Sequence, residues 1–210
     1  MNTLAIFGTS GFSREVGDIA MELGYRTIQI ARDEAELAAW SFPGDVMLEL
    51  DIERYADLDF AIGIGENGVR EQVARRFGDK RFVNLIHPSA SFGQRQRAAI
   101  DSRTGIIVCA GVRFTNNIQV GDFAIFNLNA TIGHDAIVGD FVNVAPGANI
   151  SGNVTIGARC WIGTGAAVNQ GRDGAMLRIG ADTVIGSGAV VVTECEPNAV
   201  YTGVPAKRIK

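Results

Sequence analysis

One histidine in this sequence stands beside an acid, and that pair is the most distinctive chemical feature of the chain. His134 is followed directly by Asp135. A neutral imidazole accepts a proton from an attacking amine or hydroxyl, and an adjacent carboxylate fixes its tautomer or raises its basicity. By spacing alone, a surface histidine beside a loop aspartate is the commoner arrangement. The other histidine, His87, precedes Pro88, which favours extended backbone, and a structural role is expected for it.

A glycine-rich turn near the N-terminus is a candidate phosphate site. Gly8-Thr9-Ser10-Gly11 follows a short apolar run and precedes a helical pattern. Amides at the start of a helix bind anions, but the turn lacks the full G-x-G-x-x-G spacing of a dinucleotide site. Diphosphate binding through Gly8, Ser10 and Gly11 and a simple strand-to-helix turn therefore both stay open.

Polar residues also follow the second and third predicted strands. The Asp33 side chain could meet the base or ribose of a nucleotide, or cap the helical segment after it. Gly65, Glu66 and Asn67 follow the third strand, at the sheet edge where ligands of open α/β sheets collect. Arg70 could reach a phosphate, or pair with Glu66 or Glu71 on a solvated helix face.

The elements that must position these residues differ between the two halves of the chain. In residues 1–88, apolar runs predict strands at 4–7, 27–31, 60–64 and 82–86. Between them, Val16, Ile19, Ala20 and Leu23 have helical spacing, and a second helical pattern covers 67–77. This alternation favours a small Rossmann-like α/β domain with a parallel sheet.

In residues 89–210 the period is six. One set of apolar positions is Val108, Phe114, Val120, Phe126, Ile132, Val138, Val144, Ile150, Ile156, Ile162 and Val168. Small or apolar residues recur four positions after each of the first ten. Such a hexapeptide repeat is typical of a parallel β-helix, whose three flat faces enclose an apolar interior. Cys160 falls at an inward position, which argues against a nucleophilic role.

Composition limits the partners of the chain. Its 210 residues carry a net charge of −4, which argues against nucleic acid as the main partner. No apolar run approaches the ~20 residues of a membrane span, and the N-terminus reads directly into a strand without a signal peptide, so a cytoplasmic location is expected. The three cysteines form no C-x-x-C pair, and two isolated histidines offer no ligand cluster for a metal.

The repeat half is poor in charge. Between residues 105 and 170 the charged residues are Arg113, Asp122, Asp135, Asp140 and Arg159. Flat faces with so few charges are usually buried against another surface. The sequence therefore predicts an oligomer, for which three-fold symmetry is the natural closure of a triangular prism.

Several stretches resemble one protein family. They are Ile6-Phe7-Gly8-Thr9-Ser10-Gly11, Ala61-Ile62-Gly63, Asn84 to Ala90, Ala130 to Asp135, Asp140-Phe141-Val142 and Gly203-Val204-Pro205-Ala206. In this order they resemble the left-handed β-helix sugar O/N-acyltransferases, which include sialic acid O-acetyltransferases and bacillosamine-type nucleotide-sugar N-acetyltransferases. The resemblance implies a left-handed β-helix, a homotrimer, acetyl-CoA bound along the β-helix between two subunits, and a nucleotide-linked sugar on the N-terminal domain.

The resemblance also implies roles for single residues. It makes His134 the general base, and Gly152 the residue whose amide stands near the acetyl carbonyl. Asn127 matches an asparagine near the sugar. Trp161, Gly163, Gly203 and Pro205 would line the coenzyme groove. Phe12 and Asn143 stand where bacillosamine-type enzymes carry histidines at the substrate site, so the identity of the acceptor sugar is open, and Arg172–Leu177 resembles an insertion.

The expected reaction is therefore acetyl-CoA-dependent N-acetylation of a nucleotide-linked amino sugar, by direct attack in a ternary complex. Two alternatives remain: O-acetylation of a sialic-acid-like or other sugar hydroxyl, and a non-catalytic β-helix protein that binds a nucleotide sugar.

Overall fold

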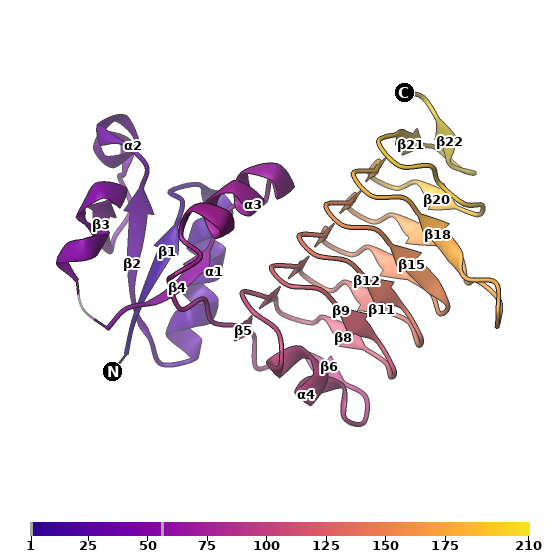
Figure 1. The fold of residues 1–210 in the computed structure, drawn as a ribbon, viewed down its shortest axis with the longest axis horizontal. Coiled ribbons are helices and arrows are strands. Elements are labelled where there is room, and N and C mark those ends of the chain that lie inside the picture. Colours follow the sequence, from indigo (N-terminus) through magenta and orange to yellow (C-terminus); the bar gives the residue numbers. More distant parts are fainter. Residues whose placement is uncertain (1, 56) are drawn as a thin grey trace.

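The computed structural model describes residues 2–55 and 57–210 and has two parts, an α/β part and a long triangular prism (Figure 1). The α/β part contains β1 (Thr3–Phe7), α1 (Gly11–Glu22), β2 (Arg26–Ala31), α2 (Glu34–Ala39), β3 (Asp45–Leu48), a 3-10 helix (Glu49–Arg54), β4 (Asp59–Ile62) and α3 (Asn67–Arg76). Its four strands are parallel in the order β3-β2-β1-β4. The Rossmann-like α/β prediction is confirmed.

The apolar patterns explain how this sheet is covered. Residues 4–7 of β1 are almost fully buried, and α1 buries Val16, Ile19 and Ala20 against the sheet. Leu23, the last residue of the predicted helical stripe, is 40% exposed because α1 ends at Glu22. β3 and the 3-10 helix were not predicted from the sequence.

The strand predicted over 82–86 is divided between the two parts. Phe82 forms a single bridge with Phe60 of β4. Leu85–Ile86 (β5) pairs instead with Ile107–Val108 (β7), so it is already a strand of the prism. The chain therefore enters the prism before the first residues of the regular repeat.

The prism has three parallel sheets. The eight-stranded sheet runs β22 (Lys207–Arg208), β21 (Val200–Thr202), β19 (Val184–Ile185), β16 (Trp161–Ile162), β13 (Asn143–Val144), β10 (Ile125–Phe126), β7, β5, with only β22 antiparallel. The six-stranded sheet runs β20 (Val190–Val191), β17 (Ala167–Val168), β14 (Asn149–Ile150), β11 (Thr131–Ile132), β8 (Arg113–Phe114), β6 (Ser91–Phe92). The four-stranded sheet runs β18 (Leu177–Ile179), β15 (Val154–Ile156), β12 (Ile137–Val138), β9 (Gln119–Val120).

The six-residue period builds this prism. Phe126 pairs with Val108 on one side and with Val144 on the other, so equivalent residues stack in columns one coil apart. Every position of the two predicted apolar series is at most 5% exposed, from Val108 to Val168. The predicted parallel β-helix is confirmed, and its interior is one continuous apolar cluster.

Two segments interrupt the regular coils. α4 (Gln96–Asp101) leaves the prism after β6, and the buried Gln96 amide pairs with both backbone groups of Ile118, at 2.8 and 2.9 Å. Further on, Leu177 pairs with Val154, so the coil between them is 23 residues long instead of 18. The extra residues fall at the insertion expected from the sequence, Arg172–Leu177.

In the part of the chain that the structure describes, no helix has the length and apolar character needed to cross a membrane.

Candidate functional site

His134 and Asp135 stand at a corner of the prism, in the turn between β11 and β12. Asp135 has a left-handed backbone (φ 59°), which turns the chain sharply from one face to the next. Its Oδ2 lies 2.7 Å from His134 Nδ1, and both side chains are less than half exposed, at 44% and 42%. With the Nδ1 proton donated to this carboxylate, the Nε2 lone pair is available to take a proton.

Asp135 is held in place by a second residue from the coil before it. Asn117 donates from Nδ2 to Asp135 Oδ1 at 2.5 Å. This hydrogen bond, followed by the one from His134, holds the pKa of Asp135 below its ordinary value. Asp135 is therefore a carboxylate fixed at both oxygens, which suits it to orient the imidazole. Asn117 was not predicted from the sequence, although it stands one repeat coil before Asp135.

Gly152 lies against the His134 ring from the coil after it. A Cβ at Gly152 would lie 2.5 Å from both Cε1 and Nε2 of the imidazole, so only glycine leaves room for the ring. The amides of Ser151 and Asn153 donate to the carbonyls of Val168 and His134. The Gly152 amide donates to no residue that the structure describes, which leaves a buried donor beside the candidate base.

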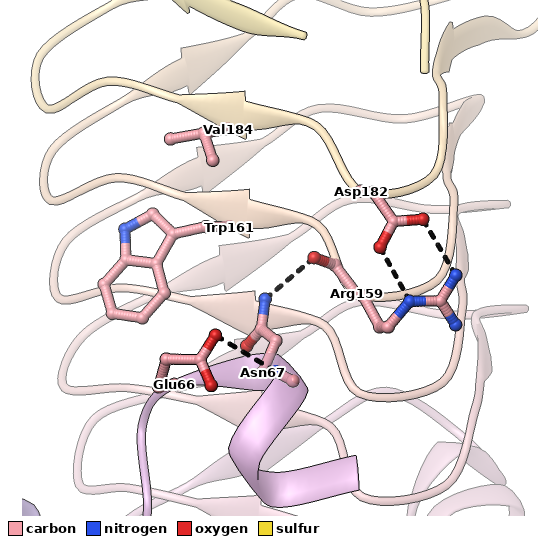
Figure 2. A pocket seen from close by; sticks show the side chains of 7 residues that line it. Glu66, Asn67, Arg159, Trp161, Asp182 and Val184 are labelled. Atoms are coloured by element: carbon pink, nitrogen blue, oxygen red, sulfur yellow. Dashed lines mark hydrogen bonds and ion pairs between the residues drawn. The ribbon is translucent and has the colours of Figure 1, made fainter. Parts of the chain in front are cut away.

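A cavity of about 440 Å³ lies between the α/β part and the eight-stranded face of the prism. Figure 2 shows Trp161 and Val184 on that face, with Glu66 and Asn67 opposite them at the start of α3. Arg159 and Asp182 close one side as a two-pronged ion pair, with N–O distances of 2.7 and 2.8 Å. An aromatic wall beside charged groups is the usual character of a ligand pocket.

The predicted residues at this cavity are used differently. Glu66 caps α3 by accepting from the amides of Gly68 and Val69, at 3.2 and 2.5 Å, and is exposed. Asn67 is buried, and its Nδ2 donates to the carbonyls of Arg159 and Cys160 at 2.9 and 3.0 Å. The Asn67 amide therefore ties α3 to the prism instead of facing a ligand freely.

Asn143 and Gly65 meet nearby. Asn143 is 3% exposed and donates to the Gly65 carbonyl at 3.0 Å. Its Oδ1 is buried and accepts no hydrogen bond from the described residues. The structure thus brings Gly65, Glu66, Asn67, Asn143 and Trp161 into one neighbourhood.

Arg70 corrects one expectation. It neither faces a phosphate nor pairs with Glu66 or Glu71 on a solvated face, since it is 1% exposed. Its guanidinium donates to the carbonyls of Ile64, Gly65, Phe123, Phe141 and Val142 and to Asn67 Oδ1, at 2.7–3.4 Å. Burial lowers the pKa of Arg70 to about 10, still well above neutrality. Arg70 is thus a cation caged by carbonyl oxygens at the joint between the two parts.

A second hollow, of about 230 Å³, lies at the carboxyl ends of β1 and β2. Gly8, Thr9 and Ser10 line it, together with Arg32 and Glu36. The Gly8 amide is already used, because it donates to the Ile30 carbonyl at 3.0 Å. Ser10 is the N-cap residue of α1, but its side chain accepts no capping hydrogen bond. The donors left for an anion are therefore the first amides of α1.

Comparison with known proteins identifies the chain. The family described as the PglD N-terminal domain matches residues 3–77. GDP-perosamine N-acetyltransferase of Escherichia coli O157:H7 is 27% identical over all of this chain and 97% of its own length. Among solved structures, WeeI from Acinetobacter baumannii AYE is 25% identical with a TM-score of 0.89, and each chain covers 100% of the other. PerB from Caulobacter crescentus, in complex with CoA and GDP-perosamine, is 28% identical with a TM-score of 0.84, covering 100% of this chain and 98% of its own.

Over its full length the chain is similar to the hexapeptide-repeat sugar acyltransferases. The resemblance stated from the sequence is confirmed, and with it the left-handed form of the parallel β-helix.

In this acyltransferase, the side chains of two predicted residues of the α/β part are engaged within the protein. Asp33 accepts from the Glu36 amide at 2.9 Å, so of its two proposed roles it performs the helix cap. That hydrogen bond holds the pKa of Asp33 below its ordinary value. Phe12 packs partly buried against the apolar cluster that contains Leu4 and Val16. Gly11 is exposed at the first position of α1.

The remaining predicted residues of the acyltransferase lie away from His134. Asn127 and Gly163 stand in turns between the eight- and six-stranded sheets, and the Asn127 Oδ1 accepts from the Leu128 amide at 2.7 Å. Gly203 and Pro205 follow β21 and are exposed. Within one chain the structure therefore does not bring these residues, or the Glu66 cavity, to the His134 edge; their binding roles stay predictions.

The other reactive side chains have structural surroundings. His87 Nδ1 accepts from the Ser89 amide at 3.0 Å, and its Nε2 lies 3.1 Å from Glu22. Cys160 is buried, and burial raises the pKa of its thiol to about 11, which disfavours the nucleophilic thiolate. Over residues 2–55 and 57–210, no group of three or more His, Cys, Asp or Glu side chains is arranged to hold a metal.

Proposed function

We propose that this acyltransferase transfers the acetyl group of acetyl-CoA to the amino group of a nucleotide-linked amino sugar. The observation that carries the proposal is the corner at His134, where an oriented imidazole, its carboxylate and a free buried amide converge. The full-length similarity to GDP-perosamine N-acetyltransferase favours an amine as the acceptor.

The reaction follows from this corner. The acceptor nitrogen attacks the thioester carbonyl carbon and passes its proton to Nε2 of His134, while Asp135 stabilises the imidazolium that forms. In this proposal the Gly152 amide donates to the carbonyl oxygen as that oxygen gains negative charge. As the tetrahedral intermediate collapses, the C–N bond is kept, the C–S bond breaks, and the CoA sulfur takes the proton from His134.

The two parts divide the substrates. Residues 1–88 would hold the nucleotide sugar, with the diphosphate at the first amides of α1, and residues 89–210 would carry the acetyl transfer. The groove along Trp161, Gly163, Gly203 and Pro205 is the proposed coenzyme path. The reaction is proposed to take place in the cytoplasm, without a metal.

A homotrimer with shared sites is part of the proposal. In one chain, His134 stands between the six- and four-stranded sheets, whereas the Glu66 cavity opens on the eight-stranded sheet. A single chain thus keeps the base and the segment Gly65–Asn67, called here the sugar loop, on different edges of the prism. A second copy packed against the prism would bring one subunit's base to another subunit's sugar loop. Size measurement by light scattering tests this assembly.

The activity is tested with purified protein, acetyl-CoA and a panel of nucleotide-linked sugars, by following thiol release and identifying the product by mass spectrometry. We expect transfer to amino sugars. Transfer only to sugars without an amine would instead favour O-acetylation. No release with any sugar would favour the binding protein.

His134→Ala tests the base. Since general base catalysis contributes typically 10²- to 10⁴-fold, turnover should fall by about that factor while the fold and oligomeric size are unchanged. His87→Ala is the matched control, because His87 contacts Ser89 and Glu22 away from this corner, and its turnover should stay as in the unmodified protein. Unchanged turnover in His134→Ala would rule out this mechanism.

A further inference from the structure

The long coil of the prism lies beside the proposed base. Its extra residues, Arg172–Met176, are called here the inserted loop. They leave the prism at the same corner that carries Asn117, His134 and Gly152 in the preceding coils. In Figure 1 the chain bulges outward next to β18, where this loop projects.

Backbone hydrogen bonds fix both ends of the inserted loop to the coil that carries Gly152. The Gly171 amide donates to the Gly152 carbonyl, and the Leu177 amide donates to the Asn153 carbonyl, each at 3.0 Å. Arg172 and Ala175 exchange two hydrogen bonds, which close the loop as a tight turn. The loop therefore begins one coil beyond Gly152, on the side toward which the His134 ring leans.

Side chains also hold the loop. The buried Asn153 donates to Asp173 Oδ1 at 3.1 Å, and Thr155 donates to the Met176 sulfur at 3.4 Å. The backbone amide of Asn153 donates to the backbone carbonyl of His134, so Asn153 contacts both the loop and the residue that carries the base. Backbone and side-chain hydrogen bonds therefore tie the loop to this corner.

The inserted loop forms one wall of a hollow that extends to Asp135, the carboxylate that orients His134. The hollow measures about 720 Å³ and is lined by Asp135, Asn153, Asp173, Gly174, Ala175, Met176, Arg178 and Glu194. Half of this lining comes from the loop. Three carboxylates face one guanidinium, a balance that disfavours phosphate groups and suits a neutral or cationic, hydroxyl-rich group.

We propose that the inserted loop is a specificity-determining element for the acceptor, and that it contacts the amino-sugar ring while the nucleotide lies elsewhere. This inference rests on the proposed function. The Asp173 carboxylate, with one oxygen held by Asn153, presents its other oxygen to a sugar hydroxyl or ammonium group, and the wall limits which ring substituents fit beside His134.

The repeat itself supplies the deciding variant. Deleting Arg172–Met176 joins Gly171 to Leu177 and restores the 18-residue coil, with Leu177 and Ile179 at regular inward positions. We expect the deletion to keep the fold by circular dichroism and the KM for acetyl-CoA. The kcat/KM for the preferred amino sugar should fall by about tenfold or more, with weaker discrimination between sugars, because a lost polar contact is worth about one tenfold step.

Asp173→Ala repeats the test without changing the backbone and decides the matter if the deletion does not fold. Asp79→Ala, an exposed acid of the α/β part, is the matched control and should leave acceptor kcat/KM unchanged. Unchanged acceptor preference in both loop variants, or a change confined to the KM for acetyl-CoA, would overturn the inference. Failure of the unmodified protein to acetylate any amino sugar would instead contradict the proposed function.

Discussion

The prism and the α/β part are stabilised in different ways. In the prism, each buried residue has an equivalent one coil before and one coil after, as Phe126 has in Val108 and Val144. At the joint with the α/β part, single side chains make contacts that nothing repeats. Arg70, for example, donates to carbonyls from both parts.

The catalytic corner combines the two kinds of construction. The repeat supplies the same backbone turn at this corner in each coil, but the residues at the turn differ from coil to coil. Asn117 precedes Asp135 by one coil, and Gly152 follows His134 by one coil. The chemistry therefore depends on the positions where one coil differs from the next. This comparison predicts that substitutions at such positions affect turnover or stability far more than equivalent substitutions elsewhere in the prism.

Gly152→Ala should have the largest effect of these. The new methyl group would occupy the place of the His134 ring, 2.5 Å from Nε2, and displace the base. We expect turnover to fall by about 10²-fold or more, measured as kcat with saturating acetyl-CoA and acceptor.

Gly147→Ala is the matched control within the same prism. Gly147 has a positive φ of 66°, and a Cβ there would meet nothing within 4 Å. Alanine should cost roughly 1–2 kcal/mol of stability from the left-handed backbone and leave turnover unchanged. Equal turnover in the two variants would show that the packing of Gly152 against His134 has no catalytic importance.

Much of the prism could be predicted because its cause is local in sequence. Period six requires an inward side chain at each step, and Val112, Ala130 and Cys160 are all buried as that rule demands. The insertion at Arg172–Leu177 was expected from the resemblance to the family, and it lengthens one coil from 18 to 23 residues. The six-residue rule gave no signal for α4, because the Gln96 amide replaces a strand partner of Ile118 only once the two segments meet.

The joint could not be predicted for a related reason. A buried arginine without a carboxylate partner is rare, and on a helix an arginine usually pairs with acids nearby. The acceptors of Arg70 come from residues 64–65, 123 and 141–142, which only the fold brings together. For Asp33, the sequence left a nucleoside contact and a helix cap open, and only the hydrogen bond to Glu36 distinguishes them.

Arg70→Met should have the next largest effect, on stability. Methionine fills similar space but leaves several buried carbonyls without a donor, and each such carbonyl costs about 1–3 kcal/mol. We therefore expect the free energy of unfolding to fall by about 3 kcal/mol or more. The α/β part and the prism each contain one tryptophan, Trp40 and Trp161. Urea unfolding followed by fluorescence in Trp40→Phe and Trp161→Phe backgrounds reports the two parts separately.

The α/β part should unfold at a lower urea concentration than the prism once Arg70 is replaced. Arg75→Met, on the exposed side of the same helix, is the control. The Arg75 side chain is 77% exposed and forms an ion pair with Glu71. Because exposed ion pairs stabilise little, the free energy of unfolding should change by no more than about 1 kcal/mol. If the α/β part of Arg70→Met unfolded at the same urea concentration as in the unmodified protein, the joint would not depend on the hydrogen bonds from Arg70 to the surrounding carbonyls.

Asn117→Gly should have the smallest effect, on the titration of Asp135. Glycine keeps the left-handed backbone of Asn117 (φ 54°) but removes the largest cause of the lowered Asp135 pKa. The pKa of Asp135 should rise toward its ordinary value and stay somewhat below it, since His134 still donates. NMR titration of the Asp135 carboxyl carbon measures this shift. Asn129→Gly, at another left-handed corner (φ 58°), should leave that pKa unchanged.

The sign of the linked stability follows from the direction of this shift. A carboxyl group whose pKa is lower in the folded state stabilises the fold above its unfolded pKa, and the contribution is lost as the pH falls through the folded value. Raising the folded-state pKa of Asp135 toward that of the unfolded chain therefore narrows the pH interval between the two values. Over that interval the contribution of Asp135 to the stability of the fold is lost as the pH falls. If the Asp135 pKa were the same in Asn117→Gly and in the unmodified protein, the orienting acid would be tuned by His134 alone, and the coil before the base would have no part in the site.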